Sequence, residues 1–165
     1  MSRCGVSRMA RLSYISQNYD LGSTEWAKTI VRRVGVYAGA CDIDVKALGP
    51  AHYCHCEDCR RCTGSINIAV QVEARSFRII AGSPRGFTKQ ADSGNPLTRY
   101  FCPECGSPLY TVSPVHPDVL YVKAGTLDDP RLVRPKRQNW MQSRVSWTTI
   151  DPALPGSPKN PEGRA

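Results

Sequence analysis

The placement of the cysteines constrains this chain more than any other feature of its sequence. Eight cysteines occur in 165 residues, and four of them lie in Tyr53-Cys-His-Cys-Glu-Asp-Cys-Arg-Arg-Cys62, at positions i, i+2, i+5 and i+8. Side chains two apart on an extended segment point to the same side. Cys54 and Cys56 should therefore lie together, and a turn across Glu57-Asp58 would bring Cys59 back to them. Three thiols can converge in this way without help from a distant segment.

A second cluster lies in Phe101-Cys-Pro-Glu-Cys-Gly106, a C-x-x-C turn. Pro103 fixes its first corner, and Gly106 is suited to a backbone close to a metal or to a positive φ. Such turns point two thiolates inward at the spacing of a tetrahedral zinc site. Together the two clusters predict zinc binding. Two alternatives stay open: buried cysteines that pack as small apolar residues, and a redox-active pair, which would normally open a helix in a βαβ unit.

The thiols are expected to be reduced rather than paired in disulfides. Cysteine makes up about 5% of the chain, less than in small domains that disulfides hold together. The N-terminus lacks the apolar stretch of a secretory signal, so no oxidising compartment is indicated. We therefore expect a cytoplasmic protein. Residues 1–23 contain three Arg and five Ser with no acid before Asp20, a composition also found in transit peptides, and this leaves a mitochondrial location open.

Beyond the first cluster the sequence has the pattern of short β-strands. Apolar residues alternate with others over 66–72, which is the period of a half-buried strand. Clusters of Gly, Pro, Asn and Ser separate further β-prone runs. We expect an all-β antiparallel domain built from several small sheets. Its other predicted strands are residues 77–80, 86–89, 97–101, 109–112, 119–122 and 145–150.

The two ends of the chain differ from this middle part. Residues 24–34 are expected to form a short helix, because Trp26, Ile30 and Val34 would share one side. Residues 151–165 hold four Pro and two Gly and are expected to end as a loose tail. Since 165 residues leave little room for two cores, we predict one zinc domain (36–156) between an N-terminal extension (1–35) and a tail (157–165).

Composition and charge argue against two classes of partner. No run approaches the roughly 18 consecutive apolar residues of a membrane span. The net charge of +8 lies at the ends: residues 1–40 hold six basic against two acidic residues, and residues 131–165 hold seven against two. The middle, with nine against ten, is nearly neutral. A nucleic-acid surface should be concentrated on the folded module, so nucleic acid is not the expected partner.

Four segments together resemble the glutathione-dependent formaldehyde-activating enzyme family, whose superfamily includes centromere protein V. They are CHCEDCRRCTGS, FCPECGSPLY, PDVLYVKAGTLDDP and SRVSWTTID, and the likeness runs from about residue 39 to residue 156. The resemblance implies a compact all-β domain with two zinc sites. Cys54, Cys56 and Cys59 would hold the catalytic zinc. Cys102 and Cys105 would join a C-x-C pair on the first strand in a closed structural site.

The first strand departs from the family pattern. The segment Gly39-Ala-Cys-Asp-Ile-Asp44 has Cys41 at the first ligand position, but Ile43 stands where the second thiolate should be. Asp42 or Asp44 could complete a site with three cysteines, because carboxylates also bind zinc. Otherwise the structural site is weakened or empty.

The resemblance implies a carbon–sulfur lyase with zinc as cofactor and glutathione as co-substrate. Its substrate would be a small thiol adduct, S-hydroxymethylglutathione. Arg60 and Arg61 follow the cysteines and could receive the carboxylates of glutathione. If Cys62 reached the metal instead, the site would be closed, and the chain would be a zinc module for protein or chromatin binding. Such a shared fold does not by itself fix the substrate.

Two other residue types near these motifs have simpler expected roles. His55, between two ligands, should face away from them. Trp140 and Trp147 are expected to pack the C-terminal strand onto the sheet, although either could line a groove.

Overall fold

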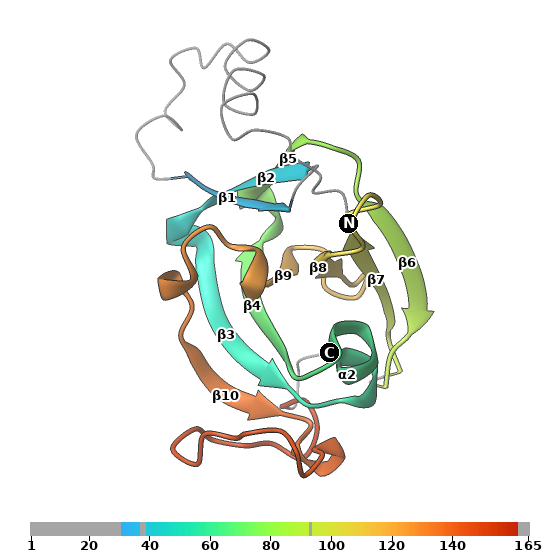
Figure 1. Cartoon of the computed structure of the whole chain (residues 1–165), viewed down its shortest axis with the longest axis vertical. Coiled ribbons are helices and arrows are strands. Elements are labelled where there is room, and N and C mark those ends of the chain that lie inside the picture. Colours follow the sequence, from blue (N-terminus) through green and yellow to red (C-terminus); the bar gives the residue numbers. More distant parts are fainter. Residues whose placement is uncertain (1–30, 37–38, 93, 162–165) are drawn as a thin grey trace, which may run out of the picture. The chain divides into compact units, whose positions relative to one another are not determined.

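The computed structural model describes residues 31–36, 39–92 and 94–161, which form two β-sheets and one α-helix (Figure 1). The smaller sheet has the order β1 (Val31–Val36), β2 (Gly39–Asp44), β5 (Phe77–Ala81). The larger sheet has seven strands, in the order β10 (Pro135–Asn139), β3 (Leu48–Cys54), β4 (Asn67–Glu73), β9 (Val119–Lys123), β8 (Pro108–Val112), β7 (Pro96–Phe101), β6 (Arg85–Gln90).

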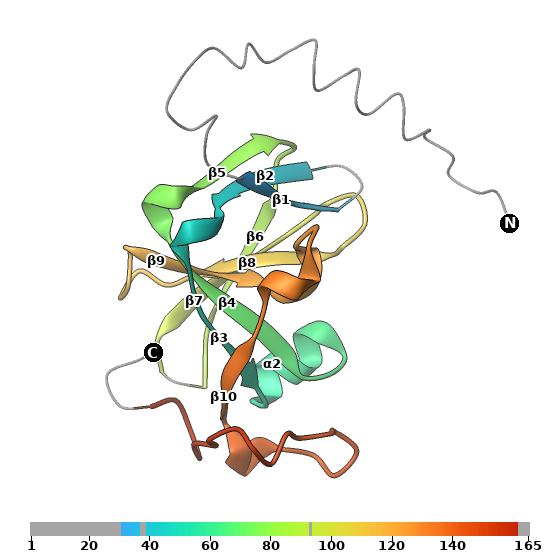
Figure 2. The same ribbon diagram turned by 90° about the vertical axis from the view of Figure 1, so that its left-hand side faces the viewer.

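Helix α2 (Glu57–Thr63) lies between β3 and β4 in the sequence. Both views place it near one end of the larger sheet, whereas β1, β2 and β5 lie at the other end (Figures 1 and 2). Single 3-10 turns occur at Val45–Ala47, Ala74–Ser76, Ala124–Thr126, Pro130–Leu132 and Met141–Ser143. Within the part of the chain that the structure describes, no helix has the length and apolar character needed to cross a bilayer.

The mostly β fold class is confirmed, and six of the predicted strands correspond to β4 to β9. The predicted strand at 145–150 is wrong: the structure has turns and irregular backbone there. Trp147, expected to pack this strand onto the sheet, is 60% exposed. One pairing also departs from the antiparallel prediction, since β10 runs parallel to β3.

Strands β3 and β10 give no strand signal in the sequence. β3 begins Leu48-Gly-Pro, and β10 reads Pro135-Lys-Arg-Gln-Asn139 with no apolar alternation. β10 forms because β3 pairs with it on one side. On the other side, Gln138 N donates to Pro155 O (2.9 Å) and Gln138 O accepts from Ser157 N (2.8 Å). Backbone pairing with distant segments, rather than local propensity, creates this strand.

Both chain ends differ from their predictions where the structure describes them. Residues 31–34, the last part of the predicted helix, belong to strand β1, which pairs with β2 from Val31↔Asp44 to Val36↔Gly39; residues 24–30 lie outside the described residues. The expected loose tail is wrong for residues 155–160. Besides the bonds to Gln138, Ser157 O accepts from Met141 N (3.0 Å) and Lys159 O accepts from Trp140 N (3.3 Å).

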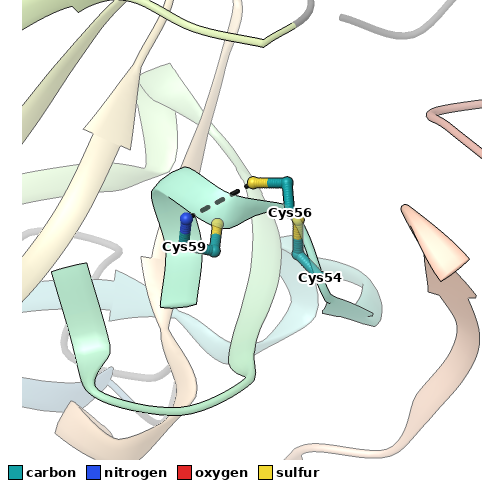
Figure 3. A group of neighbouring side chains, drawn as sticks. All are labelled: Cys54, Cys56 and Cys59. Carbon is teal, nitrogen blue, oxygen red and sulfur yellow. Dashed lines mark hydrogen bonds between the residues drawn. The ribbon is translucent and has the colours of Figure 1, made fainter. Parts of the chain in front are cut away.

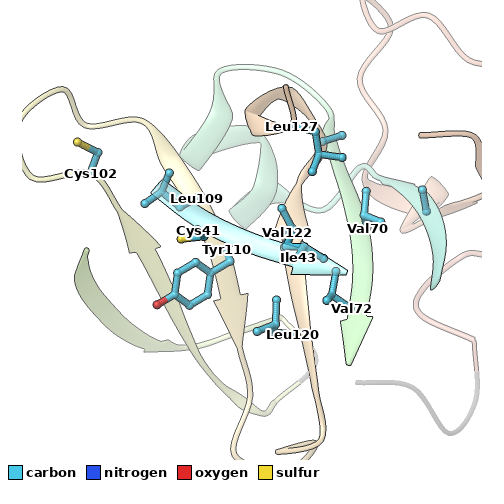
Figure 4. Packing of buried hydrophobic residues seen from close by; sticks show 12 residues of the cluster. Cys41, Ile43, Val70, Val72, Cys102, Leu109, Tyr110, Leu120, Val122 and Leu127 are labelled. Carbon is cyan, nitrogen blue, oxygen red and sulfur yellow. The ribbon is translucent and has the colours of Figure 1, made fainter. Parts of the chain in front are cut away.

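The hydrophobic core lies between the two sheets and joins them (Figure 4). Ile43 on β2, Val72 on β4 and Val122 on β9 are its most deeply buried members, with at most 1% of each exposed. Tyr110 on β8 stacks on Tyr100 of β7, with ring centroids 4.6 Å apart. The remaining buried members are Cys41, Ala51, Val70, Cys102, Leu109, Leu120, Ala124 and Leu127.

Truncating a core valine should destabilise the fold, whereas the same truncation on the surface should not. Val72→Ala removes two buried methyl groups, and we expect the free energy of unfolding to fall by about 2 kcal/mol. Val115, which is 52% exposed, provides the matched control. Val115→Ala should stay within about 0.5 kcal/mol of the wild type in urea unfolding. Equal losses in the two variants would contradict this core.

Candidate metal centre

The three cysteines of the first cluster lie at the junction between β3 and α2. Cys54 ends the strand, and Cys56 occupies the N-cap position of the helix with φ −61° and ψ 156°. The Cys56 Sγ accepts a hydrogen bond from the backbone N of Cys59 at 3.3 Å (Figure 3). The turn expected across Glu57-Asp58 is thus the first turn of a helix, where two acidic side chains suit the helix dipole. Gly64, with φ 74°, ends this helix.

The sulfur atoms of Cys54, Cys56 and Cys59 all lie within 4.8 Å of one another. Sulfurs around a tetrahedral zinc ion with Zn–S bonds of about 2.3 Å would be about 3.8 Å apart, so small adjustments would let the three thiols share one metal. Cys54 and Cys56 are buried, Cys59 is partly buried, and Trp140 packs against the first two. The donor set and its spacing fit zinc.

Cys62 does not belong to this cluster. It is exposed on the last turn of α2, and among the described residues only Cys54, Cys56 and Cys59 form a group of three potential ligands. Three protein ligands leave the fourth position of a tetrahedral zinc site for water or substrate. This arrangement is typical of reactive rather than structural zinc sites.

The three thiols share hydrogen bonds, and their pKa values separate. Hydrogen bonds with Cys54 and then Cys56 hold the pKa of Cys59 well below the usual value for a thiol. The positive charges of Lys123 and Arg99 lower it further. Hydrogen bonds with Cys56 and Cys59, together with burial, raise the pKa of Cys54. For Cys56 the bond with Cys54 lowers the pKa, but the bond with Cys59 and burial outweigh it and raise the pKa to about 11.

A groove opens beside the cysteines and encloses about 760 Å³, counting the part open to solvent. Three cationic side chains from separate strands line it: Arg99 on β7, Lys123 on β9 and Arg137 on β10. Lys123 is only 7% exposed. None of the ion pairs of the described residues includes it.

Asp58 connects the metal loop to the far side of the groove. This carboxylate is 9% exposed. Its Oδ1 pairs with Lys89 Nζ on β6, and its Oδ2 lies 3.4 Å from Arg99 Nη2 on β7. Since Asp58 follows Cys56 by two residues, these ion pairs fix the position of the loop relative to β6 and β7. They also neutralise part of the charge of Arg99, whereas Lys123 has no carboxylate partner among these ion pairs.

Trp140 covers the other side of the cysteines from an unusual backbone conformation. It has φ 61° and ψ 40°, the one left-handed conformation among the described residues other than glycine. Its indole Nε1 donates to Asn160 Oδ1 at 2.9 Å. Trp140 and Asn160 both line the groove. A strained backbone held by surrounding contacts is characteristic of functional sites.

The arginines predicted to bind a substrate lie elsewhere. Neither Arg60 nor Arg61 lines the groove. Arg61 is exposed and pairs with Glu57 one turn earlier on α2, with its Nη2 2.6 Å from Oε1. His55 faces away from the cysteines, as predicted, and its Nε2 lies 3.4 Å from Gln138 Oε1. Burial lowers the pKa of His55, which favours the neutral imidazole.

The three cysteines predicted for a second zinc site do not come together as the first three do. Cys41 and Cys102 are buried in the hydrophobic core, whereas Cys105 is exposed. Burial, and then the charge of Asp42, raise the pKa of Cys41 to about 11. The positive φ predicted at Gly106 is confirmed at 74°.

The chain matches the family described as glutathione-dependent formaldehyde-activating enzyme over residues 37–143, well over half of its length. The chain belongs to this family. Among solved structures it is similar to the crystal structure of a protein from Rhodobacter sphaeroides, with 23% identity, a TM-score of 0.44 and coverage of 57% of this chain and 85% of that chain. None of the curated proteins matches this chain.

For this member of the glutathione-dependent formaldehyde-activating family, the sequence predicted the convergence of the three cysteines but not the cations of the groove. Arg99, Lys123 and Arg137 lie on three strands that are far apart in sequence. Only a correct sheet order would have brought them beside the cysteines. The one local signal was Lys123, a charged residue that directly follows the apolar run 119–122.

Removing one sulfur of the cluster should release the metal, and removing a neighbouring exposed sulfur should not. Cys56→Ser leaves two thiols, so we expect zinc per chain to fall to below about one tenth of the wild-type value in native mass spectrometry. Cys62→Ser, on the same helix, is the control and should keep its zinc. Loss of zinc from Cys62→Ser would show that Cys62 is a ligand.

Zinc binding at this loop should release about two protons near neutral pH. The raised pKa values of Cys54 and Cys56 keep these thiols protonated at neutral pH, whereas the lowered pKa of Cys59 favours its thiolate. The zinc affinity should therefore fall about 100-fold for each unit by which the pH drops around neutrality. Calorimetry in two buffers of different ionisation enthalpy measures the proton count. A release close to zero would contradict the assigned protonation states.

Proposed function

We propose that this chain is a carbon–sulfur lyase that forms or cleaves the adduct of glutathione and formaldehyde at the loop of Cys54, Cys56 and Cys59. Family membership supports a reaction of this kind. The observation that carries the proposal is the position of the three convergent thiols, which face a groove lined by cations and have no fourth protein ligand among the described residues. A closed structural site would not combine these features.

The three cysteines would hold zinc as thiolates. Zinc bound there would lower the pKa of a substrate thiol and so supply a thiolate nucleophile at neutral pH. The contribution of the protein is to hold the three sulfurs in one place through the cap at Cys56 and the packing of Trp140. The open ligand position would then face the groove.

The cations of the groove suit the substrate proposed here. Glutathione carries two carboxylates and one ammonium group, and cationic side chains bind carboxylates through charge-assisted hydrogen bonds. Lys123 is the strongest candidate for such a contact, because its side chain is buried and takes part in none of the carboxylate ion pairs of the described residues. Arg137, across the groove on β10, would hold a second carboxylate. Tyr121 and Trp140 supply apolar surface between them.

The alternative of a closed zinc module, acting in protein or chromatin binding, would need Cys62 as the fourth ligand. Cys62 is exposed on α2, so closing the site would require this helix to unwind or turn. Asp58 opposes such a movement, because its ion pairs with Lys89 and Arg99 fix the helix to β6 and β7. The geometry therefore favours the enzyme.

Exchange spectroscopy by NMR would test the reaction directly. The rate at which formaldehyde and glutathione interconvert with their adduct should rise with zinc-loaded protein above the uncatalysed rate. Cys56→Ser should abolish this acceleration, and Cys62→Ser should keep it. A zinc-loaded wild-type protein that gives no acceleration, but binds DNA in a salt-dependent way, would favour the binding module.

The buried lysine of the groove should determine the affinity for glutathione. Lys123→Met keeps an unbranched chain but removes the charge, so we expect the KM for glutathione to rise about tenfold or more. Lys136, exposed on β10, provides the control, and Lys136→Met should leave KM unchanged. Zinc content should be the same in both variants. An unchanged KM for Lys123→Met would exclude a contact between this ammonium and the substrate.

A further inference from the structure

The second zinc site that the family resemblance implies depends on the face of strand β2 that carries Cys41. Side chains alternate along a strand, so Cys41 and Ile43 share one face, and both are buried, at 2% and 1% exposure. Ile43 occupies the position expected for a second thiolate. It belongs to the same apolar cluster as Val72 and Val122 (Figure 4). The place of a metal ligand is thus filled by a hydrocarbon side chain in close-packed surroundings.

The neighbouring carboxylates do not replace the missing thiolate. Asp42 lies on the opposite face of β2, where its Oδ2 is 4.0 Å from Arg78 Nη2 on β5. Asp44, also on that face, accepts a hydrogen bond from the backbone N of Lys46 at 2.9 Å. Turning either side chain toward Cys41 would reverse the alternation of the strand. Neither residue fits a site on the buried face.

Backbone hydrogen bonds close the C-x-x-C turn. Gly106 N donates to Cys102 O at 2.8 Å, and Cys102 N donates to Ser107 O at 2.9 Å. The two thiols differ in their surroundings. Cys102 is buried, whereas Cys105 is exposed and its Sγ donates to Ser107 Oγ at 3.2 Å. Within the described residues, no third potential ligand completes a group with these two sulfurs.

We propose that this chain binds zinc at one site only, the loop of Cys54, Cys56 and Cys59, and that Cys41 and Ile43 form apolar core where the family has its structural zinc. Four ligands are the rule for structural zinc, and here one of the four implied positions is an isoleucine and the three cysteines do not form a group of potential ligands. Burial of apolar surface takes over the role of the metal in joining β2 to the larger sheet. This inference concerns metal content and does not rest on the proposed reaction.

Native mass spectrometry of the full chain, incubated with excess zinc and then desalted, tests the inference. We expect one zinc per chain for the wild type. Cys105→Ser should also retain one zinc, whereas Cys56→Ser, the matched substitution in the loop, should retain none. Two zinc ions in the wild type and one in Cys105→Ser would overturn the inference.

Thiol labelling gives a second measurement that does not depend on folding of a variant. In the zinc-loaded wild type, a maleimide should modify Cys105 rapidly, because its sulfur is exposed and not protected by a metal. A chromogenic zinc chelator present in the same solution should show no release of metal during this modification. Release of one zinc ion per modified Cys105, with peptide mapping to locate the label, would show that Cys105 is a ligand and overturn the inference.

The two proposals fail in different ways. Absence of catalysis from a chain that holds one zinc would contradict the proposed function and leave this inference intact. Two zinc ions together with catalysis would contradict the inference and leave the function intact.

Discussion

The site depends on the convergence of three cysteine sulfurs where a strand becomes a helix. Hydrogen bonds among the three thiols, together with burial, raise the pKa values of Cys54 and Cys56, so a second thiolate in the loop is electrostatically unfavourable. A divalent cation would offset the repulsion between neighbouring thiolates by binding all three sulfurs. Hydrogen bonds of the backbone already hold the loop in a conformation that brings the three sulfurs together. The Cys56 cap bonds to Cys59 N, and His55 N donates to Asn139 O of β10 at 3.0 Å.

The groove gives the loop of Cys54, Cys56 and Cys59 the surroundings of the reaction site proposed above. Its cations come from β7, β9 and β10, which are remote in sequence but all belong to the larger sheet. The ion pair of Asp58 with Arg99 compensates one cation, and Lys123 remains as a buried positive charge close enough to lower the pKa of Cys59. A single field therefore acts on the sulfur and on any anionic substrate beside it.

At the opposite end of the fold, apolar packing holds the structure together. There the smaller sheet is joined to the larger one through Ile43, Val72 and Val122, which exclude water almost completely. Apolar burial of this kind is non-directional and needs no particular ligand geometry. Ile43, at the position where the family resemblance implies a thiolate, fits the fold because the cluster around it is apolar.

The sequence by itself determined the features that depend on near neighbours. The spacing of Cys54, Cys56 and Cys59 predicted their convergence, alternation over 66–72 predicted β4, and Gly106 predicted a positive φ. Tertiary structure alone decided the features that depend on sheet order. Polar β10 becomes a strand because β3 and Pro155–Ser157 bond to it, and the groove takes its cations from β7, β9 and β10 instead of Arg60 and Arg61. Local periodicity constrains a few residues at a time, whereas strand order is set by backbone pairing and burial over the whole sheet.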